Sequence, residues 1–190
     1  MSGPALYALP PDSVAVGGAR YALNTGHRTA LRALAALEDG RLAVFEQQGL
    51  LLRLLYKGTV PPAGDEALRA AVWFLNCGRE DPGPQGPRVY SFSGDGPLIY
   101  AAMQKSCGVD LWGPEIHWWR FAALLADIGE DTLFARVVYL RRQRALGRLT
   151  PAERRAAAAR GPLLDLPGDS APRGEEAAFF NCLRKGGTAT

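Results

Sequence analysis

The two histidines of this sequence, His27 and His117, are its side chains best suited to proton transfer near neutral pH. His117 stands next to Trp118 and Trp119 in an apolar stretch. A catalytic histidine needs positioned partners, such as a second histidine or a nucleophile motif, and neither lies near it in the sequence. We therefore interpret His117 as a neutral, hydrogen-bonded residue in the core or at its edge, with a pH-sensitive or catalytic role as the alternative. The tryptophans are core anchors first, and binding residues if they are exposed.

Sequence patterns for metals and nucleotides are missing. No His-x-x-x-His or Cys-x-x-Cys pair has metal-ligand spacing, and neither glycine-rich phosphate-binding pattern occurs. Ser93-Gly-Asp-Gly96 could hold an anion at a helix N-terminus, but a turn followed by an N-cap is the simpler interpretation. We expect no catalytic, cofactor-binding or metal-binding residues, no cofactor and no enzymatic activity.

Basic residues are concentrated between positions 136 and 160, where Glu153 is the only acidic residue. The basic residues are Arg136, Arg141, Arg142, Arg144, Arg148, Arg154, Arg155 and Arg160. Three interpretations stay open: a solvated helical face, a surface for an acidic or helical protein partner, and a nucleic-acid surface. No aromatic residue follows Tyr139 in this stretch to stack on bases, which disfavours single-stranded nucleic acid. The candidate partner-binding residues are Arg136, Arg141, Arg142, Arg144 and Arg148.

Composition indicates one ordinary globular domain. The chain has 190 residues, of which 47% are hydrophobic and 22% charged, and its net charge of +3 does not by itself imply nucleic acid. Three widely spaced cysteines, Cys77, Cys107 and Cys182, argue against a disulfide framework and fit a reducing cytoplasm. No signal peptide is visible, and no apolar run approaches the roughly 20 residues of a membrane span. We therefore expect a soluble intracellular protein.

The elements that must position these residues are mostly helices. Apolar residues alternate around Gly17-Gly18, a two-residue turn signal that predicts a β-hairpin over residues 13–24. Apolar spacing and capping signals predict helices over residues 25–39, 42–56, 65–75, 96–107, 114–128, 132–146 and 150–160. Asn24 or Thr25, Asp65, Asp95 and Asp131 are N-cap candidates, and Thr150 with Glu153 forms a capping box.

Two of these predicted helices carry further expectations. The helix that starts at Pro114 is the most apolar of the chain and should be central and largely buried. Leu133, Val137 and Leu140 should face inward from the next one. The sequence thus predicts a mainly α-helical single domain over residues 13–160 with a small N-terminal β-hairpin, a flexible N-terminus over 1–12 and a flexible tail over 161–190.

Several segments resemble the bacteriophage Gp15 family in order and spacing. They are Asp95-Gly-Pro-Leu-Ile-Tyr-Ala-Ala102, Cys107-Gly-Val-Asp-Leu111, Glu115-Ile-His-Trp-Trp-Arg-Phe121, Thr132-Leu-Phe134 and Tyr139-Leu-Arg141, together with the N-terminal hairpin. The His-Trp-Trp-basic-Phe core is the most specific part, and the resemblance covers roughly residues 8–160. The family-motif and core residues that it marks are Asp110, Leu111, His117, Trp118, Trp119 and Phe121.

The resemblance implies a protein of the tail module of long-tailed phages, encoded between the major tail protein and the tape-measure protein. Proteins at that place resemble tail assembly chaperones, which would keep the long helical tape measure soluble while tail-tube subunits polymerise around it. The expected partners are therefore the tape-measure protein and neighbouring tail-assembly proteins, in the cytoplasm of a bacterial host that carries the phage or prophage. A minor structural or adaptor component of the tail is the alternative, and a nucleic-acid-binding protein with arginine-rich helices is the second. Self-association stays open.

Overall fold

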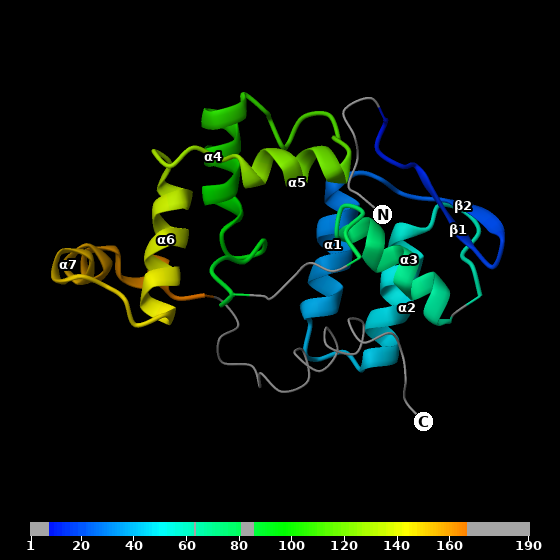
Figure 1. Ribbon diagram of the computed structural model, residues 1–190, viewed down its shortest axis with the longest axis horizontal. Coiled ribbons are helices and arrows are strands. Elements are labelled where there is room, and N and C mark those ends of the chain that lie inside the picture. The colour runs from blue at the N-terminus through cyan, green and yellow to red at the C-terminus, as the bar shows by residue number, and fades with distance from the viewer. Residues whose placement is uncertain (1–7, 63, 81–85, 167–190) are drawn as a thin grey trace. The chain divides into compact units, whose positions relative to one another are not determined.

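The computed structural model describes residues 8–62, 64–80 and 86–166 of the chain (Figure 1). The fold is mainly α-helical with one N-terminal β-hairpin, as predicted. Contacts divide the described residues into two compact units, one of residues 8–80 with 115–122 and the other of residues 86–114 with 123–166. Whether residues 13–160 unfold together as one cooperative domain stays a prediction.

The hairpin of the first unit has the predicted two-residue turn. Strands β1 (Ser13–Val16) and β2 (Ala19–Ala22) pair antiparallel, and Gly17 and Gly18 between them both adopt positive φ angles. A two-stranded ribbon is marginally stable on its own, so it must be held by another element. The Gly17 N–H donates to the Glu66 carboxylate at 2.9 Å, which ties the turn to the start of helix α3 (Asp65–Leu75).

Helices α1 (His27–Glu38) and α2 (Val44–Leu55) belong to the first unit together with α3, and all three lie close to the predicted ranges. The predicted N-caps are wrong for two of them, because Gly26 and Gly64 take the N-cap positions. Asn24 lies two residues before the N-cap Gly26, and its side-chain amide donates to the Leu54 carbonyl at 2.8 Å. The Thr25 carbonyl instead accepts the Trp118 N–H at 2.7 Å, so this stretch pairs with distant backbone before the helix begins.

Helices α4 (Gly96–Cys107), α6 (Leu133–Ala145) and α7 (Pro151–Arg160) belong to the second unit. The predicted start and end of α4 are confirmed, with Gly108 in the left-handed region after its last turn. The predicted Thr150–Glu153 capping box is present at the start of α7. At the start of α6, however, Thr132 is the N-cap in place of Asp131, and its hydroxyl accepts the Ala135 N–H at 3.1 Å.

The inward face of α6 differs from the predicted one. Phe134, Val137 and Leu140 are buried, whereas Leu133 is 48% exposed and was wrongly placed inside. Residues 134, 137 and 141 share one face at helical spacing, and Leu133 lies beside that face. The buried side of α6 therefore includes Arg141, a candidate surface residue.

Helix α5 (Trp118–Ala126) starts four residues after the predicted Pro114. The residues before it are extended, since the His27 N–H donates to the Ile116 carbonyl and Gly26 pairs with His117 as an antiparallel bridge. Burial is also more local than predicted: Trp118, Trp119 and Phe121 in the first turn are buried, and the last three residues of the predicted apolar face are only half-buried.

The chain remains packed beyond residue 160, where the domain boundary was placed. The 3₁₀ helix η1 (Gly161–Leu164) follows α7, and Leu164 packs on Val137 and Leu140 of α6. At the other end, the carbonyls of Pro11 and Asp12 already make hydrogen bonds. The rest of the predicted flexible segments, residues 1–7 and 167–190, lies outside the described residues. No described helix is long and apolar enough to cross a lipid bilayer.

Candidate partner-binding surfaces

Both histidine rings make hydrogen bonds with backbone groups of the first unit. His117 Nδ1 accepts the Trp119 N–H at 3.1 Å, and its Nε2 lies 3.2 Å from the Pro11 carbonyl. An Nδ1 that accepts a hydrogen bond carries no proton, so the proton belongs on Nε2, which donates to that carbonyl. His27 is buried, accepts the Ile116 N–H on Nδ1 at 3.3 Å and stacks on Phe121. These arrangements agree with the structural interpretation of His117.

The two tryptophans of the motif cap a helix. The Trp118 indole N–H donates to the Leu75 carbonyl at 2.9 Å, and that of Trp119 donates to the Phe74 carbonyl at 2.8 Å. Both acceptors are at the end of α3, where the last carbonyls have no partner within the helix. Phe121, fully buried, stacks on Trp118 at 5.5 Å. The His-Trp-Trp-Arg-Phe motif is therefore mainly a packing device that secures the last turn of α3.

The other two motif residues organise the turn after α4. One oxygen of Asp110 accepts the Trp112 N–H at 2.9 Å and faces the Tyr100 hydroxyl at 3.3 Å, while Leu111 is half-buried. This turn presents Trp112 with 78% of its surface exposed. Sequence reasoning did not single out Trp112, although a tryptophan followed by Gly-Pro, outside any helical stripe, was a usable signal.

Arg141 is buried, so it is not part of the candidate partner-binding surface. Its guanidinium makes two hydrogen bonds to the Asp95 carboxylate, at 2.6 and 3.0 Å, and both side chains are only 4% exposed. It also donates to the carbonyls of Val89 and Leu163. Asp95 does occupy the predicted N-cap position of α4, but its carboxylate turns to Arg141 and the Ser91 N–H instead of capping the helix.

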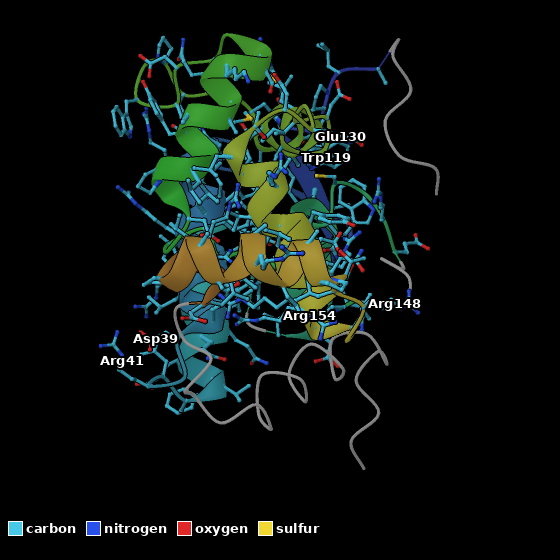
Figure 2. The ribbon with its side chains drawn as sticks, turned by 90° about the vertical axis from the view of Figure 1, so that its left-hand side faces the viewer. Asp39, Arg41, Trp119, Glu130, Arg148 and Arg154 are labelled. Carbon is cyan, nitrogen blue, oxygen red and sulfur yellow. The ribbon has the colours of Figure 1, made fainter. Side chains whose placement is uncertain are left out.

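Other candidate arginines remain at the surface. Arg136, Arg142 and Arg148 are exposed and make no ion pair with any described residue, whereas Arg144 pairs with Asp165 at 3.1 Å. Figure 2 shows Arg148 in the connection between α6 and α7, and Arg154 on α7. By contrast, the exposed Arg41 at the end of α1 is paired with Asp39 at 2.8 Å.

Two exposed apolar residues lie among these arginines, one on α6 and one at its C-cap. Tyr139 is 48% and Leu146 44% exposed, and helical spacing places them on the same side as Arg136 and Arg142. We call these four residues the α6 face. The Tyr139 hydroxyl donates to the Glu153 carboxylate at 2.6 Å, a contact that raises the pKa of Tyr139 and lowers that of Glu153. The α6 face is thus both apolar and basic, and its aromatic ring is held in place.

The cysteines and the glycine-rich turn give little sign of reactivity. Burial raises the pKa of the Cys77 thiol to about 11, so this group is a thiol and a poor nucleophile near neutral pH. Cys107 is also free, and Cys182 lies outside the described residues. In the turn Ser93-Gly-Asp-Gly96, the Asp95 carboxylate is already paired with Arg141.

The chain combines a helical fold and an N-terminal hairpin with a buried aromatic motif and a helix face that is both basic and apolar. Comparison with known families identifies it: residues 8–159 match the family described as Bacteriophage Gp15 protein. The chain belongs to this family and is a phage-associated protein. No curated protein and no solved structure matches the chain.

Proposed function

We propose that this protein is a non-enzymatic tail assembly chaperone that binds the phage tape-measure protein in the host cytoplasm. Membership of the bacteriophage Gp15 family supports a phage role. The single structural observation that carries the proposal is the α6 face, which exposes Tyr139 and Leu146 beside two arginines that have no carboxylate partner among the described residues.

The chemistry of the α6 face suits an amphipathic helix. A tape-measure chain that is not yet inside its tube exposes apolar stripes, and a compact protein can cover such a stripe along a helix. Arginine is enriched at protein interfaces because its flat head pairs with carboxylates and stacks on apolar groups. An interface at or below the standard size of about 1,600 Å² would let tube subunits displace the chaperone later.

Co-expression with the tape-measure protein tests the proposal. The wild-type chain should raise the soluble yield of the tape measure and co-purify with it. The double variant Arg136→Glu and Arg142→Glu should lose both effects, because it reverses the charge of the α6 face. The matched control is Arg53→Glu with Arg69→Glu, which changes the net charge equally at exposed positions of α2 and α3. Arg141 is excluded from the test because its reversal would bury two like charges together.

Mass spectrometry of purified virions separates the chaperone from a structural adaptor. A chaperone is absent from finished tails, because polymerised tube replaces its contacts with the tape measure. Absence of tape-measure binding, together with a stoichiometric amount of this chain in mature tails, would instead establish the adaptor role. Sub-micromolar binding to DNA or RNA at physiological salt, with a steep salt dependence, would favour the nucleic-acid alternative.

A further inference from the structure

The turn after α4 holds an exposed aromatic pair in a fixed geometry. The Trp112 ring stacks on the Tyr100 ring with centroids 4.0 Å apart and an interplanar angle of 17°. One Asp110 oxygen accepts the backbone N–H of Trp112 at 2.9 Å and the Tyr100 hydroxyl at 3.3 Å, so one carboxylate contacts both residues. Trp112 is nevertheless 78% exposed. Stacking on Tyr100 restricts the exposed Trp112 side chain before any partner binds, and such preorganisation lowers the entropy cost of a binding anchor.

The charge beside this pair indicates what it binds. Asp110 is exposed and makes no ion pair with any described residue. An indole face attracts cations, and a guanidinium can stack on it while pairing with an adjacent carboxylate. An arginine side chain therefore satisfies both Trp112 and Asp110.

The same unit carries arginines that lack such a partner. Arg136 and Arg142 on the α6 face are exposed and make no ion pair within the described residues. Neither arginine pairs with Asp110 of the same chain, and Figure 1 shows the chain leaving α4 on the side away from α6. We propose that the α6 arginines of one copy bind the Trp112–Asp110 anchor of a second copy, so that the protein self-associates head to tail.

Such a contact joins two different surfaces, so a pair of copies still has one free α6 face and one free Trp112–Asp110 anchor. It therefore continues into rings or short filaments and does not stop at a symmetric dimer. The contact needs this chain alone, so its test is independent of the proposed partner. Because it covers the α6 face, a tape-measure helix bound there would compete with it and return the protein to single copies.

Sedimentation velocity of the full chain, at concentrations up to about 1 mM, measures the association. The wild-type average mass should rise with concentration above the 20.4 kDa of one chain and fall again in high salt. Trp112→Ala should weaken association at least tenfold, and so should Arg136→Glu with Arg142→Glu. Arg53→Glu with Arg69→Glu should associate like the wild type. Thermal melting of each variant checks that it remains folded.

Mixing the two defective variants tests the head-to-tail geometry. The Trp112→Ala chain keeps its α6 arginines and the charge-reversed chain keeps its anchor, so an equimolar mixture should form dimers and stop there. A wild type that stays at single-chain mass throughout, a Trp112→Ala variant that associates normally, or a mixture that does not associate would each overturn the proposal. If the wild type is monomeric but still binds the tape measure through the α6 face, the proposed function survives without the self-contact.

Discussion

The two compact units differ in how much of their conspicuous sequence is buried. In the first unit, Trp118 and Trp119 of the motif around His117 are both buried, and their indoles donate to the end of α3. In the second unit, the neighbours Arg141 and Arg142 separate: one is buried against Asp95 and the other is exposed. In this protein, therefore, the distinctive sequence motif marks packing, whereas the surfaces available to partners consist of less distinctive residues.

The largest effect on stability should come from removing a large aromatic side chain from the core of the first unit. Trp118→Ala should destabilise the protein by about 3–5 kcal/mol, because it removes a large buried ring. It also leaves the Leu75 carbonyl without its donor. Phe121→Ala should fall in the same range, since Phe121 is fully buried. Chemical denaturation of the purified variants measures both losses, and wild-type stability of either would mean that the motif is not a packing device.

The same variants test whether the two units unfold together. If residues 13–160 form one domain, Trp118→Ala should lower the melting temperature of both units together, in a single calorimetric transition. Two separated transitions, with only one shifted, would show that the units are independent domains.

Loss of the buried ion pair in the second unit should have the next largest effect on stability. Arg141→Ala should cost about 3 kcal/mol or more, because it leaves the Asp95 carboxylate buried without its cation. Arg142→Ala, one residue further along, should change stability by no more than about 0.5 kcal/mol. Equal effects of these two neighbours in urea denaturation would contradict the distinction between a buried and an exposed arginine.

A smaller effect is expected at Gly78, where the first unit needs a glycine. Gly78 has a φ of +81°, and an added Cβ would lie 2.9 Å from the Trp119 ring. Gly78→Ala should therefore destabilise by about 1–2 kcal/mol through left-handed strain, with further loss if Trp119 must shift. Near-ultraviolet circular dichroism reports a displaced tryptophan, and Gly58→Ala is a control that has a similar φ but an open surrounding space.

The smallest effect should be a local one at the start of α7. Thr150→Ala should cost about 1 kcal/mol by removing the N-cap. The hydrogen bonds from Tyr139 and Thr150 hold the pKa of Glu153 below its ordinary 4.5. A lowered pKa means stability that is present above pH 4.5 and is lost as pH falls through the folded-state value. Amide hydrogen exchange should show α7 opening before α4 on acidification, and the reverse order would exclude this role for Glu153.

Local patterns in the sequence predicted most of the secondary structure. The Gly17-Gly18 turn, the α4 boundaries at Asp95 and Gly108, and the Thr150–Glu153 capping box all follow from short-range backbone chemistry. The predicted start of α5 at Pro114 is wrong because the residues before Trp118 pair with the backbone near Gly26. Such pairing joins segments about 90 residues apart, and no local signal reports it.

Family membership and element type were determined by the sequence alone, since both depend on residue order and spacing. Tertiary structure decided which arginine is buried, because Arg141 and Arg142 have the same local chemistry and only Arg141 meets Asp95. It also decided that Trp112 is exposed while Trp118 and Trp119 are buried. Burial depends on which distant backbone and side chains close around a residue, and that is settled only when the elements pack.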